Sequence, residues 1–168
     1  MSFPEDLEYP EPRYHGDKGE VNATFRLAST PPDVSSPGGA THFIATHEST
    51  GGEFGLFKAE LGARSAGAKP HFHKAMSESF YILSGELELY DGDKWVTGRE
   101  GDFLYVPVGG LHGFRNVTDE PMSMLMLFSP GGPREEYFER VAEVAQRGRE
   151  ELKEFRIRHD SYFVEDFE

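Results

Sequence analysis

The sequence predicts an all-β sandwich or barrel followed by a short helical extension. Turn-forming residues divide the chain into short segments about every ten residues, a spacing typical of these all-β folds. The pair Asp91-Gly92 lies between two strand-like segments and is the typical sequence of a β-hairpin turn. After the Pro-Gly-Gly-Pro segment at 130–133, the hydrophobic residues change to helical spacing.

Ten strands are expected before that change of period. Each is a short run of apolar, aromatic or β-branched residues, bounded by residues that favour turns. The expected strands are Thr24–Ala28, Ala40–His47, Glu53–Glu60, His71–His73, Ser79–Leu83, Glu86–Tyr90, Lys94–Thr97, Phe103–Val106, Gly113–Val117 and Met122–Phe128.

Two helices are expected in the extension. Pro133 suits the first turn of a helix, where a missing N–H costs nothing, and Glu135 and Glu136 suit its positive end. Gly148 supplies an end for this helix. A second, shorter helix is expected over Glu150–Phe155.

The length of 168 residues fits one domain with a sizeable core. We therefore expect residues 1–168 to form a single domain in three parts. Residues 1–39 would be an N-terminal arm with the first strand, residues 40–128 the barrel core, and residues 129–168 a helical extension over one mouth or edge of the sheets.

The charge balance bears on the class of partner. The chain has 17 Lys and Arg against 30 Asp and Glu, a formal net charge of −13. Such a surface repels nucleic-acid phosphates and anionic membranes, so neither partner is expected. No apolar run is long enough to span a bilayer. The absence of cysteine and of a visible secretory signal favours a cytoplasmic protein.

The most informative residues are three histidines and one glutamate. His71 and His73 are two apart, so in a strand both side chains project from one face. Glu78 lies at an odd offset from them, so the chain must bend between residues 74 and 77 for its carboxylate to join them. His112 follows a Pro/Gly turn and opens a returning strand. Each histidine alone would be a surface or core residue, but the set predicts a metal site.

Three imidazoles and one carboxylate suit one divalent transition metal per chain: Fe, Mn, Ni, Co, Cu or Zn. The single carboxylate leaves such a site with a net charge of +1, which favours an anionic oxygen donor. Positions remain for water, substrate or dioxygen, as catalytic sites require. We expect no other cofactor.

These residues resemble the two sequence motifs of the cupin superfamily. The first motif is Gly, five residues, His-x-His, three or four residues, Glu, six residues and Gly. The chain matches it at His71, His73, Glu78 and Gly85, whereas Ser65 stands at the opening glycine. The second motif is matched throughout, at Gly101, Pro107, Gly109, His112 and Asn116.

The resemblance covers about residues 40–128 and implies a double-stranded β-helix, a jelly-roll-like barrel, with the three histidines and Glu78 on the metal. One copy of each motif indicates a monocupin. Within that group the chain is similar to bacterial quercetinase-type (flavonol) dioxygenases and to cupins of polyketide clusters. This resemblance implies that Glu78 is both a ligand and the catalytic base that takes a substrate proton. It also implies a homodimer.

Candidate substrate contacts come from strand alternation. Phe80 and Phe114 share faces with Glu78 and His112, and Met124 belongs to an alternating methionine row on the last strand. A planar, aromatic small molecule suits such a lining. The same alternation also fits plain core packing.

Three functions are compatible with these features. The first is oxidation, by dioxygenation, of an aromatic or polyketide-like enol or phenol at the metal, with dioxygen as co-substrate. The second is a redox-neutral isomerase or cyclase that uses the metal as a Lewis acid. The third is a cupin that binds a small molecule without chemistry. The complete ligand set favours an enzyme over simple binding.

Overall fold

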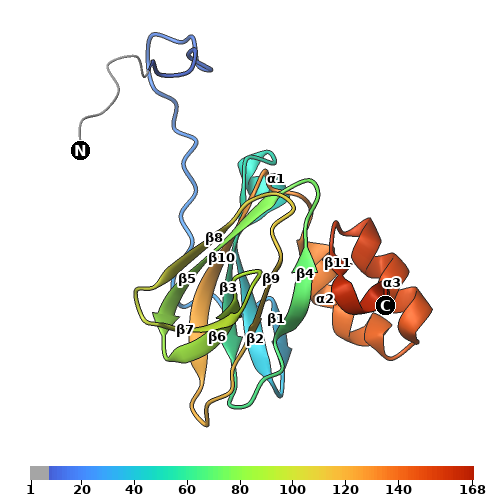
Figure 1. Cartoon of the computed structure of the whole chain (residues 1–168). Coiled ribbons are helices and arrows are strands. Elements are labelled where there is room, and N and C mark those ends of the chain that lie inside the picture. Colours follow the sequence, from blue (N-terminus) through green and yellow to red (C-terminus); the bar gives the residue numbers. More distant parts are fainter. Residues whose placement is uncertain (1–7) are drawn as a thin grey trace.

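Two antiparallel sheets packed face to face form the body of the chain (Figure 1). The computed structural model describes residues 8–168. One sheet has, in spatial order, β1 (Val34–Ser36), β2 (Gly39–Ala45), β3 (Gly55–Leu61), β10 (Met122–Ser129), β5 (Ser77–Ser84) and β8 (Phe103–Val106). The other has β11 (Tyr162–Phe163), β4 (Ala68–Phe72), β9 (His112–Arg115), β6 (Glu86–Tyr90) and β7 (Trp95–Arg99).

The core lies between the sheets because inward-facing side chains alternate along the strands. On β10, Met122, Met124, Met126 and Phe128 are buried, while the residues between them are more exposed. Burying one such side chain contributes roughly 1.5–3 kcal/mol. The remaining core side chains are Phe57, Ala59, Met76, Phe80, Ile82, Leu87, Leu89 and Val106.

The double-stranded β-helix with a helical C-terminal part is confirmed, and most of the expected strands are present. The strands over Glu86–Tyr90 and Phe103–Val106 have the expected bounds. The hairpin at Asp91-Gly92 joins β6 to β7, and the Asp91 carboxylate accepts hydrogen bonds from the N–H groups of Asp93 and Lys94.

The expected strand over Thr24–Ala28 is wrong. This segment pairs with no strand in the described part of the chain, and its Phe25 side chain is 89% exposed. The first strand is β1 instead, which was not expected. Residues 8–25 form an exposed N-terminal segment, and residues 1–7 of the expected arm lie outside the described residues. His47, expected in a strand, begins α1 (His47–Thr50), because Thr46 caps that helix.

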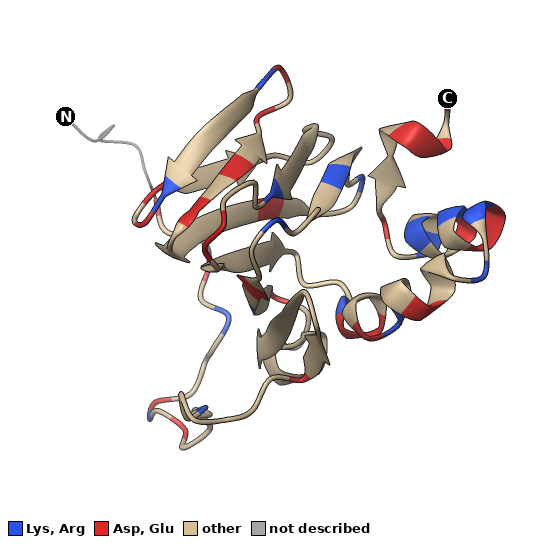
Figure 2. Cartoon of the chain, turned by 90° about the horizontal axis from the view of Figure 1, so that it is seen from below, with Lys and Arg blue, Asp and Glu red and all other residues tan. Residues whose placement is uncertain are grey.

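The extension contains α2 (Glu135–Ala145), α3 (Arg149–Arg158), the two-residue strand β11 and a 3-10 helix, η1 (Val164–Asp166). Both expected helices are present, and α3 is longer than expected. The helices stand beside the barrel next to β4 and β11 (Figure 1). Charged residues of both signs are dense on α2 and α3 (Figure 2). Within residues 8–168, no helix is long and apolar enough to cross a membrane.

Asn116 holds the loop that follows β9. Its side chain is 1% exposed, and its amide N–H₂ donates to the carbonyls of Gly62 (2.9 Å) and Glu120 (2.8 Å). Its amide oxygen accepts from the N–H (2.9 Å) and the hydroxyl (2.8 Å) of Thr118. The buried side chain thus holds the loop after β9 in shape and ties it to the segment that follows β3.

We predict that Asn116→Ala destabilises the fold by about 2–4 kcal/mol, because it leaves several buried polar groups without partners. Urea unfolding followed by circular dichroism measures this loss. Asn22→Ala, at an exposed position of the N-terminal segment, is the control and should leave the free energy of unfolding unchanged. A similarly small change in the free energy of unfolding in both variants would contradict the structural role of Asn116.

Candidate metal centre

Strands β4 and β9 of one sheet and β5 of the other bring the four predicted ligands together. His71 lies on β4 directly opposite His112, the first residue of β9. His73 follows the end of β4, and Glu78 is the second residue of β5. Between them residues 73–76 leave the sheet, which is the bend that the odd spacing requires. All four side chains therefore point into the barrel.

The four side chains are buried and their donor atoms converge. Their relative exposures are 5% for His71, 2% for His73, 3% for Glu78 and 0% for His112. One potential ligand atom from each lies within 4.8 Å of those of the other three. Oε2 of Glu78 is 3.0 Å from Nε2 of His73 and 2.7 Å from Nε2 of His112.

Backbone carbonyls orient all three imidazoles. Nδ1 of His71 contacts the carbonyl of Lys69 at 2.8 Å, and Nδ1 of His112 contacts that of Gly110 at 3.0 Å. Nδ1 of His73 contacts the carbonyl of Asp160. Because a carbonyl only accepts, each Nδ1 carries the hydrogen, and Nε2 is the nitrogen left to bind a cation. This is the usual outer arrangement of metal-binding histidines.

The electrostatics of the cluster call for a positive charge at its centre. Three Nε2 lone pairs and a carboxylate cannot face one another in a buried space without a cation between them. A proton on Nε2 or a divalent metal ion meets this need. The donor set of nitrogen and oxygen atoms suits a divalent transition metal, so the residues present fit the metal that the fold implies.

Two opposed effects set the charge states of the cluster. Burial acts to raise the pKa of Glu78, but hydrogen bonds with His112 and His73 outweigh it and hold that pKa well below its ordinary value. Burial, reinforced by the nearby His112, lowers the pKa of His71 well below its ordinary value. Burial also opposes the charged form of His112, yet the hydrogen bond with Glu78 leaves its pKa raised. The carboxylate is therefore ionised and available to a cation.

An apolar groove is lined by residues of the barrel and of the extension, and none of the four cluster residues is among them. Its volume is about 670 Å³, within the usual range for small-molecule sites. It reaches Phe163, whose ring stacks on His71 with centroids 4.5 Å apart. Its apolar lining includes Phe114, Met126, Tyr137, Phe138 and Val141.

Of the three predicted substrate contacts, Phe114 lines this groove, whereas Phe80 and Met124 do not. Phe80 is fully buried, with its ring 5.8 Å from those of His112 and Phe114. Phe114 lines the groove. Met124 packs in the core opposite Ile82 and Ala59 and does not line the groove, whereas Met126 does.

Sequence analysis missed the part of the extension that contacts the cluster. Asp160 meets His73, Phe163 stacks on His71, and the guanidinium of Arg134 is buried nearby. These residues lie outside the two motifs. Only the aromatic and charged composition of the last ten residues hinted at a packed segment there.

Comparison with known proteins agrees with this geometry. The family model described as "Cupin domain" matches residues 57–128, a range that contains all four residues of the cluster. The chain contains a cupin domain. Ser65 stands where the cupin motif has its opening glycine, and two residues later Gly67 has a φ of +60° and leaves no room for a side chain, since a Cβ there would lie 2.0 Å from the carbonyl oxygen of Phe114.

Two curated relatives match about half of this chain. A quercetin 2,3-dioxygenase of Bacillus subtilis is 29% identical over 88 residues, which cover 52% of this chain and 26% of the relative. The polyketide synthase CurC of Streptomyces cyaneus is 34% identical over 86 residues, which cover 51% of this chain and 53% of the relative. The alignments thus span at most about half of these two relatives.

A solved structure shares the fold at lower identity. The polyketide cyclase RemF of Streptomyces resistomycificus superposes with a TM-score of 0.55 at 21% identity, and the match covers 66% of this chain and 82% of RemF. The likeness supports the cupin fold independently of the sequence motifs.

We predict that the purified, untagged protein holds about one divalent transition metal per chain. The His71→Ala, His73→Ala double variant should lose it, because two of the four donors are gone. A His15→Ala, His42→Ala double variant removes two histidines outside the cluster and should keep it. Elemental analysis of the three proteins checks this. Equal metal content in both double variants would contradict the site.

Metal removal should also lower thermal stability. A metal at 100 times its dissociation constant stabilises the folded state by about 2.7 kcal/mol. For a chain of this size, that corresponds to a shift in melting temperature of roughly 5–10 °C. Melting curves with added Ni²⁺ and with excess chelator check this. A melting temperature that does not respond to the metal would contradict metal binding to the folded state.

Proposed function

We propose that this chain is a metal-dependent cupin enzyme, a quercetinase-like dioxygenase that oxidises an aromatic or polyketide-like enol or phenol with dioxygen. The observation that carries the proposal is the buried set of His71, His73, His112 and Glu78, with every imidazole fixed through Nδ1. The quercetin dioxygenase relative supports the reaction class, and the cupin domain supports the metal.

Two roles are assigned to the cluster residues, metal binding and proton acceptance. The three Nε2 atoms and the Glu78 carboxylate would hold the metal, and the cation would supply Lewis acidity and, for a redox-active ion, a route to dioxygen. Glu78 would also accept the hydroxyl proton of the substrate at its carboxylate. Hydrogen bonds with His112 and His73 keep Glu78 in the unprotonated form that this step would need, while the lowered pKa also makes its carboxylate a weaker base.

The apolar groove supports an aromatic substrate. Phe114, Met126 and Phe163 would contact the flat face of such a molecule, and Phe80 would close the space behind His112. Met124, set in the core beside Ile82, would support this wall from behind. The strongly acidic surface of the chain makes nucleic acid an unsuitable partner. Pairing of edge strands in a homodimer would cover the sheet edges.

A redox-neutral cyclase is the alternative. In this alternative the same donors would polarise a carbonyl without consuming dioxygen, and both the polyketide synthase CurC relative and the polyketide cyclase RemF, which shares the fold, are compatible with it. The dioxygenase requires dioxygen as a co-substrate, whereas the redox-neutral cyclase does not.

We predict that the protein reconstituted with Fe, Mn, Co or Ni consumes dioxygen when quercetin is added, and that uptake needs both the metal and the substrate. Glu78→Gln should lower kcat by about 100-fold or more, since it removes the carboxylate that accepts the proton. An oxygen electrode and product analysis measure both. Glu154→Gln, on the exposed side of α3, is the matched control.

Two results would contradict the dioxygenase. Product formation under strict anaerobiosis would favour the cyclase or an isomerase. Stoichiometric binding of aromatic ligands without any product, by the wild type and by Glu78→Gln alike, would favour a binding protein.

A further inference from the structure

The segment 159–163, between α3 and η1, contacts the candidate metal centre from outside the matched cupin domain. Its β11 residues pair with β4, with Phe163 opposite His71 and Tyr162 opposite Phe72. Its Asp160 meets His73. Two of the three imidazoles are therefore held partly by the extension rather than by the barrel alone.

Asp160 makes three contacts at the point where β4 ends. Its carbonyl accepts the Nδ1–H of His73. Its carboxylate accepts the backbone N–H groups of Lys74 (2.9 Å) and Ala75 (2.8 Å). These two N–H groups belong to the bend that carries the chain from His73 to Glu78. One residue thus fixes both an imidazole and the turn that brings the carboxylate to it.

The backbone of Asp160 is strained. Its φ is +53°, in the left-handed region that non-glycine residues seldom adopt. Aspartate tolerates this region better than most residues because its side chain can hydrogen-bond locally. This conformation closes α3, because the N–H of Asp160 donates to the carbonyl of Ile157 (3.0 Å) and the N–H of Ser161 donates to that of Arg156 (2.8 Å). The carboxylate is then directed to the bend that follows β4.

Buried contacts keep the segment in place. Arg134 is 4% exposed and donates to the carbonyl of His159 and to the hydroxyl of Ser161, one residue on either side of Asp160. No carboxylate in residues 8–168 forms an ion pair with Arg134. Its guanidinium instead binds this segment and packs against aromatic rings, and it lies 4.1 Å from the centre of the Tyr137 ring.

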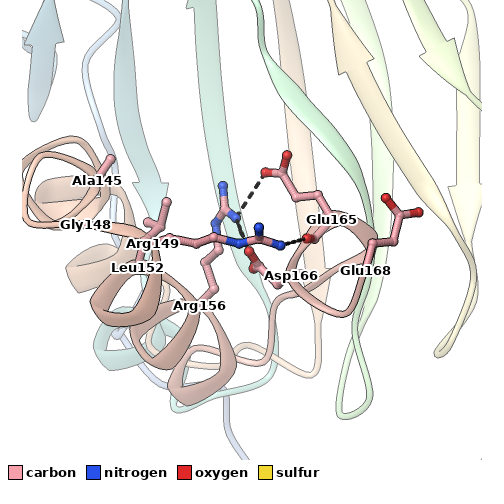
Figure 3. A pocket seen from close by; sticks show the side chains of 8 residues that line it. All are labelled: Ala145, Gly148, Arg149, Leu152, Arg156, Glu165, Asp166 and Glu168. Carbon is pink, nitrogen blue, oxygen red and sulfur yellow. Dashed lines mark hydrogen bonds and ion pairs between the residues drawn. The ribbon is translucent and has the colours of Figure 1, made fainter.

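A second anchor lies on the far side of the segment. The guanidinium of Arg156 lies over the Phe163 ring, 3.8 Å from its centre, and pairs with Asp166 at 3.0 Å and Glu165 at 3.3 Å (Figure 3). Phe163 is therefore stacked between this guanidinium and His71. The anchor ties η1 to α3 and holds β11 against β4.

We propose that Asp160 is a positioning residue for the metal centre: it orients His73 and fixes the bend that delivers Glu78, and in this way sets the affinity for the metal. The carbonyl contact keeps the hydrogen of His73 on Nδ1 and its Nε2 free for the metal. Outer contacts of this kind are typically worth 10–100-fold in metal affinity. The inference depends on the metal centre of the proposed function.

The test is a titration of the full-length protein with Ni²⁺ against a competing chelator. Asp160→Gly removes the carboxylate and, since glycine adopts positive φ freely, removes the strain as well. Asp160→Asn keeps an amide oxygen that can accept one of the two N–H bonds. Asp102→Gly is the matched control, because the Asp102 carboxylate accepts the N–H of Arg99 in a turn near the other end of β5.

Asp160→Gly should bind Ni²⁺ about 10–100-fold more weakly than the wild type, Asp160→Asn should lie between the two, and Asp102→Gly should match the wild type. The absorption spectrum of the Co²⁺-loaded protein should change in both Asp160 variants, since the position of His73 changes. Should Asp160→Gly fail to fold, Asp160→Asn decides the question by the same two measurements.

Wild-type affinity and an unchanged Co²⁺ spectrum in both Asp160 variants would overturn the inference while leaving the metal centre intact. An equal loss of Ni²⁺ affinity in Asp102→Gly would also overturn the inference, because replacing an aspartate far from the cluster would then weaken metal binding as much as replacing Asp160. Failure of the wild type itself to bind Ni²⁺ or Co²⁺ would overturn the metal centre and the inference together.

Discussion

The Nε2 atoms of three imidazoles and the carboxylate of Glu78 face one another in a buried space, and this arrangement of acceptors requires a cation. The surrounding structure maintains it at a cost. β4 ends before His73, the chain bends away from the sheet, and Asp160 adopts a strained backbone. Each of these departures from regular structure adjoins the cluster in space. A fold that needed only a packed core would fill the same space with apolar side chains, as the other end of this barrel does with Ile82 and Leu87.

The barrel and the extension contribute different parts of the site. The barrel supplies the four donors and, through Lys69 and Gly110, the carbonyls that orient His71 and His112. The extension supplies the carbonyl that orients His73 and the ring that stacks on His71. It also lines the apolar groove with residues of α2 and β11. Residues outside the matched domain therefore shape both the metal centre and the nearby groove, so relatives that share only the barrel need not share the substrate.

Local patterns predicted most of the barrel. Alternation and turn residues place β6 and β8 at their bounds, and the two-residue spacing of His71 and His73, with the required bend before Glu78, brings the whole cluster together. Thr24–Ala28 has the composition of a strand but lacks a partner, and pairing depends on distant residues that no local window contains. The contacts of Asp160, Arg134 and Phe163 were not predicted for the same reason. They join positions about 25 to 90 residues apart, and no motif links them. The identities of the metal and the substrate depend on outer contacts and on groove shape, which residue spacing does not determine.

X-ray absorption spectroscopy of the metal-loaded protein tests the central claim most directly, because it reports the atoms around the ion. The account predicts a shell of light atoms at about 2.0–2.2 Å with the outer scattering of three imidazole rings, and a loss of that scattering in the His71→Ala, His73→Ala double variant. A shell of oxygen atoms alone, unchanged in that variant, would show that the ion binds acidic surface groups and would contradict the metal centre proposed for this chain.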